Sequence, residues 1–456
     1  MREKKNATVD LTTGSPIRKL VAFALPLMIG AVFQLMYNMV DTVVLGKFVS
    51  AEALAAVGAT ASTTGLVMMI ANAFSNGMSI LISQAWGAKD EKSIRGMMGL
   101  SLLVSAAVSV VISVLAITLA RPLMRLLGTP EDIIADSITY VRIACGLYAA
   151  QMFYNASSAI LRAIGDSRTP LYFLIFCSLM NIVLDLMFVL ALKAAVAGVA
   201  WATVLSQLTS AVLCCGYMWR KYPVLRFGLA DLKVKRALLS RYFTVTLPMV
   251  FQNAVLSVGQ MAITSCINSF GSSIVAAYTV GCKVEQVVIT VFGQLAFSFS
   301  IYAGQNYGAK QYDRITRGVH EGLLLLAALV GFSMAVMLLG GYQLSLLFVN
   351  AEETEIIAAA MKMIRTEACF LPALCLIWVY NSALRGIGHV VPTVISAMVE
   401  LGCKIGFAFG LSALFGYVGI WFAAPLGWVM GLIPIVPYFY FSGWKKKAET
   451  EEAKHG

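Results

Sequence analysis

Long apolar runs, separated by short clusters of polar and turn-forming residues, fill the chain from about residue 17 to residue 442. Because a helix rises about 1.5 Å per residue, about 20 apolar residues cross the ~30 Å hydrocarbon core of a bilayer. We therefore expect an all-α polytopic membrane protein with about twelve transmembrane helices. The predicted spans are approximately 17–45, 54–84, 94–120, 133–160, 169–192, 197–219, 240–267, 274–304, 316–341, 355–383, 391–413 and 418–442.

Polar residues inside these runs recur every three or four positions, so each set lies on one face of its helix. Such a face finds no hydrogen-bond partner in lipid and is expected to point inward. Two interpretations stay open: hydrogen bonds that join helices, on the order of 0.6–2 kcal/mol each, or the walls of a hydrated cavity. The stripes are Gln34, Tyr37, Asn38 and Asp41; Asn72, Asn76, Ser79 and Ser83; Gln151, Asn155 and Ser158; Asn253, Ser257, Gln260, Thr264 and Asn268; and Lys283, Gln286, Thr290 and Gln294.

The chain repeats itself at a spacing of about 221–223 residues. The loop SQAWGAKDEKSIRG (83–96) matches GQNYGAKQYDRITRG (304–318), and SAILRAIGDSRTP (158–170) matches NSALRGIGHVVPT (381–393). Pro26 and Pro248 also lie at matching points. Six predicted helices in each half indicate a parallel duplication, in which two pseudo-symmetric six-helix bundles surround a central cavity, as in transporters.

The repeat and the charge clusters divide the chain into five expected parts. These are a cytoplasmic tail (1–16), an N-lobe (17–219), a basic cytoplasmic linker (220–239), a C-lobe (240–444) and a second cytoplasmic tail (445–456).

Composition agrees with the hydrophobic pattern. The chain is 59% hydrophobic and 12% charged, with a mean hydropathy of +0.81, whereas soluble domains carry about 25% charge. A net charge of +11 raises the possibility of nucleic-acid binding, but 25 of the 34 Lys and Arg residues fall in the alternate loops that include both termini, and four fall in the opposite set. The positive-inside rule then predicts two cytoplasmic termini, and we expect no nucleic-acid partner.

The positions of the cysteines and histidines argue against a disulfide framework, a metal centre and an enzyme. All nine cysteines lie in apolar segments without a CxxC pair, and the three histidines lie near segment ends or in the tail. We expect no cofactor beyond a coupling ion.

Two aspartates lie inside apolar segments of the N-half. Asp41 ends the first stripe, and Asp185 follows Asn181 by one turn in MNIVLDLM, while Thr203 lies in the next segment. An intramembrane acid is a functional candidate by default, and these segments contain no central Lys or Arg. The acids suit either a carried proton or a Na⁺ ion held by carboxylate, amide and hydroxyl oxygens. The sequence leaves H⁺ and Na⁺ equally open.

The C-half acids have nearby bases. Glu400 and Lys404 are spaced for an ion pair on one helix face, which predicts a structural role. Glu367 lies beside Arg365 and is expected near the outer surface, also in a structural role. The side chains of Glu285 and Lys283, two residues apart, point in different directions from their helix, which makes them poor ion-pair partners.

The segment LPLMIGAVFQLMYNMVDTVVLG, the QAWGAKD loop and the LRAIGDSRTP loop together resemble the multidrug and toxic compound extrusion (MATE) family, and NIVLD resembles its prokaryotic DinF-like branch. The resemblance covers about residues 17–444. It implies a monomeric antiporter in the bacterial inner membrane that exports bulky, often cationic drugs or dyes against H⁺ or Na⁺. It also implies cation binding at Asp41, Asp185, Asn181 and Thr203, and helix bending at Pro26.

The same resemblance suggests further residues in substrate contact or coupling: Gln34, Tyr37, Asn38, Asn155, Asn253, Gln260, Glu285 and Gln286. Where the NorM-like branch has a glutamate in its seventh segment, this chain has Gln252 and Asn253. The alternative function is a lipid-linked oligosaccharide flippase of the same superfamily, which needs several cations to hold pyrophosphate. The N-half core lacks them, and only Lys283 and Lys404 are candidates in the C-half.

Overall fold

The computed structural model describes residues 8–455, with the side chains of residues 37–43, 46, 47, 51 and 451–455 outside the description. The described chain contains helices and turns but no strand, which confirms the predicted all-α fold class. The elements of the first half are α1 (Pro16–Val44), a π-helical turn η1 (Leu45–Val49), α2 (Ala51–Ala59), α3 (Ala61–Gly87), α4 (Glu91–Leu126), α5 (Ile134–Ala144), α6 (Ala149–Ala163), α7 (Arg168–Leu186), a second π-helical turn η2 (Met187–Ala191) and α8 (Ala195–Lys221).

Two short 3-10 turns, η3 (Pro223–Leu225) and η4 (Leu229–Leu232), form the connection to the second half. Its elements are α9 (Arg236–Asn268), α10 (Ser272–Gly308), α11 (Tyr312–Ser345), α12 (Thr354–Gly386), α13 (Val391–Phe415), α14 (Tyr417–Trp421), α15 (Ala423–Phe441) and α16 (Trp444–His455).

Eleven stretches of the described chain are long and apolar enough to cross a membrane, each matching a predicted segment. The predicted segment 133–160 was wrong as a continuous helix, because it is α5 and α6 separated by a turn. A Cβ atom at Gly146 would lie 2.0 Å from the Arg142 carbonyl oxygen, so the chain passes too close there for any other residue. The Tyr148 hydroxyl then donates to the Val67 carbonyl at 3.2 Å and fixes the start of α6.

Two other predicted spans are also interrupted. Segment 54–84 breaks at Thr60, whose hydroxyl donates to the Val57 carbonyl at 2.7 Å and ends α2. Segment 418–442 breaks at Phe422, between α14 and α15. The break at Thr60 involves no proline, so the apolar pattern gives no sign of it. Pro425 follows the break at Phe422 in the first turn of α15, where it has no amide hydrogen to continue the helix from α14.

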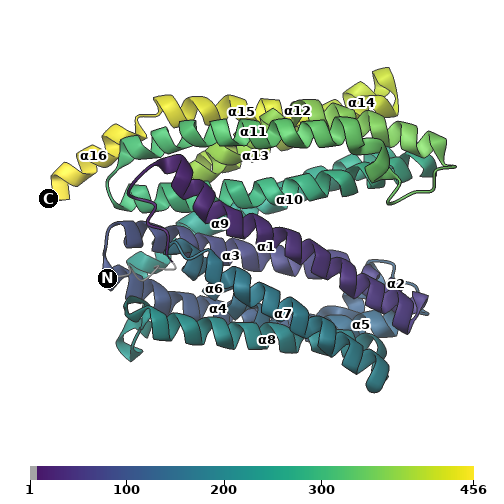
Figure 1. Ribbon diagram of the computed structural model, residues 1–456, viewed down its shortest axis with the longest axis horizontal. Coiled ribbons are helices and arrows are strands. Elements are labelled where there is room, and N and C mark those ends of the chain that lie inside the picture. The colour runs from purple at the N-terminus through teal and green to yellow at the C-terminus, as the bar shows by residue number, and fades with distance from the viewer. Residues whose placement is uncertain (1–7, 456) are drawn as a thin grey trace. The chain divides into compact units, whose positions relative to one another are not determined.

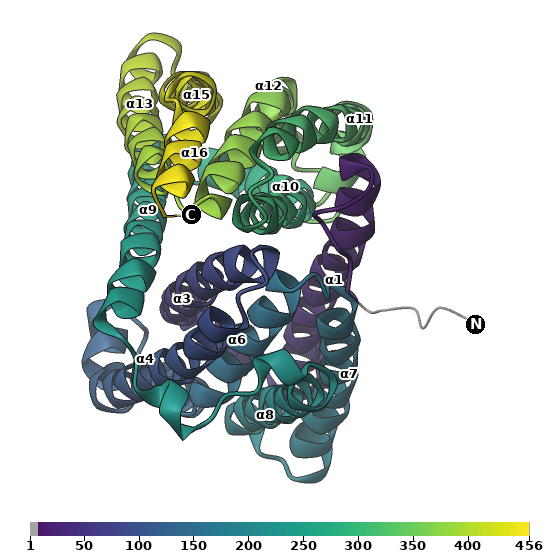
Figure 2. The ribbon, with the colours of Figure 1, turned by 90° about the vertical axis from the view of Figure 1, so that its left-hand side faces the viewer.

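The chain forms two compact units. Among the described residues, unit 1 contains 8–10 and Leu25–Thr246, and unit 2 contains Leu11–Ala24 and 247–455. The division falls inside α1 and α9, two residues before Pro26 and Pro248. In Figure 1, α4, α6, α7 and α8 of unit 1 run alongside one another, and Figure 2 shows α10, α11, α12, α13 and α15 of unit 2 nearly end-on. The predicted lobe boundaries, drawn from the sequence repeat, stay predictions.

The repeated loop motifs adopt the same backbone conformation in both halves. Lys89 and Lys310 have φ angles of 56° and 61°, and each donates its amide to the carbonyl three residues earlier at 3.1 Å. Gly165 and Gly388 have φ angles of 92° and 86° and make the same kind of bond. A left-handed residue favours glycine and commonly ends a helix. The duplication seen in the sequence therefore extends to the turn geometry.

Aspartates cap two helices of unit 1. Asp90 accepts hydrogen bonds from the Ser93 amide at 3.0 Å and the Ser93 hydroxyl, which stabilise the carboxylate and hold the pKa of Asp90 below its ordinary value. Asp166, fully buried, accepts from the Thr169 amide and hydroxyl and from the Tyr222 hydroxyl at 2.8 Å. The last bond ties the start of the connecting segment to the α6–α7 turn.

Candidate functional site

A small apolar cluster in unit 1 holds three helices together at one level. Four side chains are at most 6% exposed and contact one another: Val44 at the end of α1, Leu45 in η1, Val189 in η2 and Val199 in α8. In Figure 1 the ends of α1 and α7 lie toward the same end of unit 1, where α7 turns back into α8. The backbone around this cluster is therefore fixed by side-chain packing.

Three of the four residues predicted to bind a cation each lie one helical turn from this cluster. Asp41 precedes Val44 by three residues, Asp185 precedes Val189 by four, and Thr203 follows Val199 by four. Because α1 and α7 run toward the cluster and α8 runs away from it, all three positions fall on its same side. The fold thus brings three separate sequence positions to one level of unit 1.

The polar face of α7 is buried. Asn181 and Asp185 are both 0% exposed, whereas Leu179 and Val183 are 61% and 64% exposed. Since α7 packs against α8, its polar pair lies inside the unit and its apolar face lies outward. Thr203, half-buried on α8, donates its hydroxyl to the Val199 carbonyl at 3.0 Å. Asn181, Asp185 and Thr203 each interact with another group of the chain.

Other predicted positions on α1 are less informative. The backbone of Tyr37, Asn38 and Asp41 is helical, but their side chains lie outside the described residues. Gln34, one turn or more before them, is exposed. Pro26 lies within α1, two residues past the point where the helix passes from unit 2 into unit 1.

Charge and ligand type limit what this site can hold. The sequence contains no Lys or Arg within residues 20–46, 169–192 or 194–219. The central parts of α1, α7 and α8 therefore supply no basic side chain to neutralise Asp185. No group of three His, Cys, Asp or Glu residues able to hold a metal occurs in the described part of the chain. The carboxylate of Asp185, the Asn181 amide and the Thr203 hydroxyl are oxygen donors, which suit a proton or a hard monovalent cation.

Most predicted polar residues of unit 2 do not gather into one site. Gln252 is 4% exposed and bonds Thr393 twice, donating to its carbonyl at 3.1 Å and accepting from its hydroxyl at 3.3 Å, so it joins α9 to α13. Asn253 is half-buried, while Gln286 is exposed. In unit 1, Asn155 is half-buried on α6. Asn155, Asn253 and Gln286 stay predictions for substrate contact.

Gln260 has a partner that sequence reasoning missed. Its side-chain amide donates to the Tyr278 hydroxyl, and the Tyr278 ring stacks on Trp421 with centroids 6.0 Å apart. Tyr278, Cys282 and Glu285 follow one another at steps of four and three on α10. This spacing places the three residues on one helix face, beside the more polar stripe that begins at Lys283.

The acids of unit 2 differ partly from expectation. The predicted Glu400–Lys404 ion pair is confirmed, with Oε1 and Nζ 2.6 Å apart. The expectation that Glu367 lies near the outer surface with Arg365 was wrong, because Glu367 is 3% exposed while Arg365 is exposed. Residues two apart on a helix point in different directions, and burial of Glu367 turns Arg365 outward.

Comparison with known proteins identifies the fold and the family. The family model MatE matches residues 26–187 and 248–410, two ranges offset by 222–223 residues, as the internal repeat predicts. A solved structure described as "Crystal structure of MATE in the bent conformation" shares the fold, with a TM-score of 0.89 over 98% of this chain and 99% of that chain at 23% identity.

Relatives from Bacillus subtilis (strain 168) match along nearly the whole length. The "Probable multidrug resistance protein YoeA" is 30% identical over 443 residues, covering 95% of this chain and 95% of that protein. The "Probable multidrug resistance protein YpnP" is 24% identical and covers 96% of this chain and 97% of that protein. With most of the sequence matched by one family model, the chain belongs to the MatE family of polytopic membrane transporters.

Proposed function

We propose that the protein is a cation-coupled multidrug efflux antiporter of a bacterial plasma membrane, a monomer with both termini in the cytoplasm. Its substrates would be bulky amphiphilic compounds, often cationic, and its coupling ion H⁺ or Na⁺. The observation that carries the coupling part is the buried Asn181–Asp185 face of α7, held beside α1 and α8 by the Val44–Val189–Val199 cluster. The drug-export part is supported by the names of relatives such as YoeA.

The proposed coupling step is neutralisation of the N-half acids. A proton or Na⁺ entering from outside binds Asp185 and Asp41, with Asn181 and Thr203 supplying amide and hydroxyl oxygens. A charged carboxylate is strongly disfavoured in apolar surroundings, whereas its neutralised form is disfavoured much less. Neutralisation therefore changes which packing of α1 against α7 is favoured, and α1 bends near Pro26.

The membrane supplies the driving force. One elementary charge moving inward gains about 2.3 kcal/mol for each 100 mV of membrane potential. In alternating access, the substrate site opens to each side of the membrane in turn. Outward drug release and inward cation entry then belong to one cycle. Export therefore proceeds against the drug gradient.

The flippase alternative has less support. A lipid-linked pyrophosphate requires several cations in the cavity, and Lys404, one of the two basic candidates of the C-half core, is already bonded to Glu400 at 2.6 Å. An amphiphilic cation makes no such demand. We therefore propose drug export rather than lipid transfer.

Everted membrane vesicles test the proposal. Vesicles that contain the protein should accumulate a cationic dye when a pH gradient alone, or a Na⁺ gradient alone, is imposed, and control vesicles should not. The gradient that drives uptake identifies the coupling ion. Equal dye uptake in both vesicle types under either gradient would contradict cation-coupled export.

A further inference from the structure

The segment that joins α8 to α9 is rich in basic residues and poor in acids. Residues 220–241 contain seven Lys or Arg residues and one acid, Asp231, which accepts the Gly228 amide at 2.8 Å and closes the η4 turn. All seven basic residues are exposed: Arg220, Lys221, Arg226, Lys233, Lys235, Arg236 and Arg241. Seven positive charges and one negative charge leave a net charge of +6 on this face of unit 1.

Most of these positive charges are not used within the protein. Arg226 donates to the Trp219 carbonyl at 2.8 Å, and Arg241 donates to the Gln84 side chain at 2.7 Å. The other five side chains make no ion pair or hydrogen bond within the described part of the chain. These five free basic residues are Arg220, Lys221, Lys233, Lys235 and Arg236. Their charges are therefore available to a partner outside the chain.

The acids at the start of α4, against which η3 and η4 pack, are already occupied. Asp90 caps the helix by accepting the Ser93 amide at 3.0 Å. Glu91 forms an ion pair with Arg95 at 3.2 Å. Neither carboxylate is left to neutralise the five free basic residues.

The segment lies at the level where α4 enters its apolar run. A Cβ atom on Gly99 would be 2.4 Å from the Asp231 carbonyl oxygen, so the η4 backbone rests directly on α4 at this point. No charged residue follows Arg95 on α4 until Arg121, which places Gly99 in the first turn of the apolar run. Figure 2 shows the teal segment crossing the ends of α8 and α4 at the edge of unit 1. This position corresponds to the surface of the bilayer.

Exposed apolar side chains accompany the charges. Leu229 in η4 is 86% exposed, and Trp219 at the end of α8 is 46% exposed. The Trp219 ring meets the Phe227 ring edge-on, with centroids 5.7 Å apart. Tryptophan is enriched at the headgroup level of membranes, and apolar side chains beside Lys and Arg are typical of segments that bind a bilayer surface. The composition therefore fits a lipid interface.

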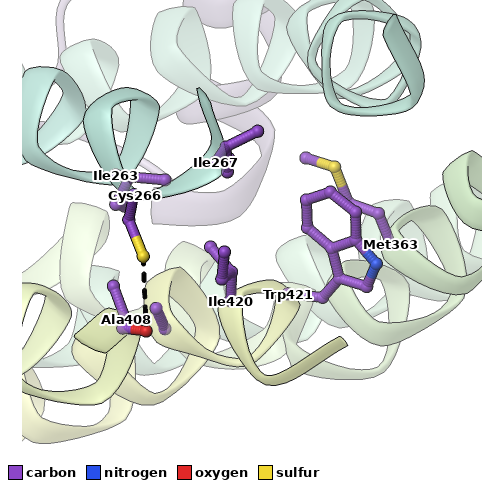
Figure 3. Close-up of a cluster of buried hydrophobic side chains, with 8 residues drawn as sticks. Ile263, Cys266, Ile267, Met363, Ala408, Ile420 and Trp421 are labelled. Carbon is purple, nitrogen blue, oxygen red and sulfur yellow. Dashed lines mark hydrogen bonds between the residues drawn. The ribbon is translucent and has the colours of Figure 1, made fainter. Parts of the chain in front are cut away.

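The same segment leads into α9, whose two ends belong to different units. The first part belongs to unit 1, where the Tyr242 hydroxyl donates to the Phe74 carbonyl at 3.0 Å. The last part belongs to unit 2, where Cys266 lies in a cluster with Ile420 and donates its thiol to the Ala408 carbonyl at 3.7 Å (Figure 3). Attachment of the segment to lipid would thus fix the point at which the chain leaves unit 1.

We propose that residues 219–236, the connecting surface, bind anionic phospholipid in the leaflet beside them. The five free basic residues bind the headgroup phosphates, Trp219 lies among the headgroups, and Leu229 inserts at the boundary of the acyl chains. Clusters of basic residues next to a transmembrane helix favour anionic over zwitterionic headgroups. That this leaflet is the cytoplasmic one rests on the proposed orientation, whereas the lipid binding depends on neither orientation nor transport.

Native mass spectrometry of the purified full-length protein, titrated with phosphatidylglycerol or phosphatidylcholine in detergent, tests the proposal. The wild type should bind the first phosphatidylglycerol molecule more tightly than phosphatidylcholine, and less so as the ionic strength rises. A basic residue near an anionic lipid surface changes affinity about fivefold. Lys233→Gln/Lys235→Gln, which removes two of the five free charges, should therefore bind phosphatidylglycerol at least about fivefold more weakly, with phosphatidylcholine binding unchanged.

Lys446→Gln/Lys447→Gln is the matched control. Both lysines are exposed on α16, where three glutamates nearly balance four lysines, so this variant should keep the wild-type affinity for phosphatidylglycerol. Equal phosphatidylglycerol affinity in the wild type and in Lys233→Gln/Lys235→Gln would overturn the proposal. The positive charges would then serve only to orient the chain during membrane insertion.

A photoreactive side chain tests the insertion of Leu229. In vesicles of equal parts phosphatidylglycerol and phosphatidylcholine, the full-length variant Leu229→benzoylphenylalanine should crosslink to phospholipid, seen as added lipid mass on the peptide that contains position 229. The same group at Lys446 should give no lipid adduct. Absence of an adduct at position 229 would contradict the insertion. Because neither measurement involves dye or a gradient, a failed drug-export assay would leave these results standing, and the reverse.

Discussion

Asp185→Asn is expected to abolish cation-driven dye export, with uptake into everted vesicles at least about tenfold below the wild type. A tenfold lower rate corresponds to an activation free energy higher by about 1.4 kcal/mol. Asparagine keeps the size of aspartate but can neither carry a proton nor supply a charge to Na⁺. Asp185 is 0% exposed, inside the unit, so no neighbouring solvent replaces it. Asp41→Asn should behave in the same way.

The loss should be functional and not a folding defect. Insertion of a charged acid at a helix centre is unfavourable by about 2.5–3.5 kcal/mol, so the neutral variant should reach the membrane in at least equal amount. Asp136→Asn provides the matched control, because Asp136 is an exposed acid in the first turn of α5 in the same unit. Wild-type dye export by Asp185→Asn, at equal protein amount, would remove Asp185 from the mechanism.

Breaking the Glu400–Lys404 pair is expected to cause the largest loss of stability. Removing one partner of a buried ion pair leaves an uncompensated charge and typically lowers the free energy of unfolding by about 3–5 kcal/mol. Glu400 is 8% exposed, and Lys404 lies against α15 where a Cβ on Gly427 would be 2.6 Å from its Cγ atom. Glu400→Gln and Lys404→Met should therefore each lower the apparent melting temperature in detergent.

The double variant separates charge from packing. With both charges removed, Glu400→Gln/Lys404→Met should recover most of the melting temperature, since replacing a whole buried pair by neutral groups is often tolerated. Strictly additive losses in the double-mutant cycle would mean that the 2.6 Å contact contributes no coupling energy.

The apolar runs predicted the fold well because lipid permits few alternatives to the helix. They failed at local breaks such as Gly146 and Thr60, where a close backbone approach or a hydroxyl bond ends a helix inside an apolar stretch. Nothing in the hydrophobic pattern distinguishes these positions from neighbouring small or polar residues.

The sequence predicted some features of the candidate site and missed others, as it did for the fold. Asn181 and Asp185 were found because a spacing of four places them on one helix face, and their complete burial agrees with that assignment. The burial of Glu367 depends on how α12 packs against α10 and other helices, and spacing along one helix does not reveal that packing. The Tyr278–Trp421 stack joins residues more than 140 positions apart, beyond the reach of local patterns.

Counterflow in proteoliposomes tests the central claim most directly. With purified protein, an imposed gradient of cationic dye alone should drive H⁺ or Na⁺ across the membrane in the opposite direction, recorded by a pH-sensitive or Na⁺-sensitive probe in the lumen. Wild-type protein should show this cation movement, and Asp185→Asn should not. Dye movement by the wild type with no opposing movement of either cation would contradict cation-coupled antiport.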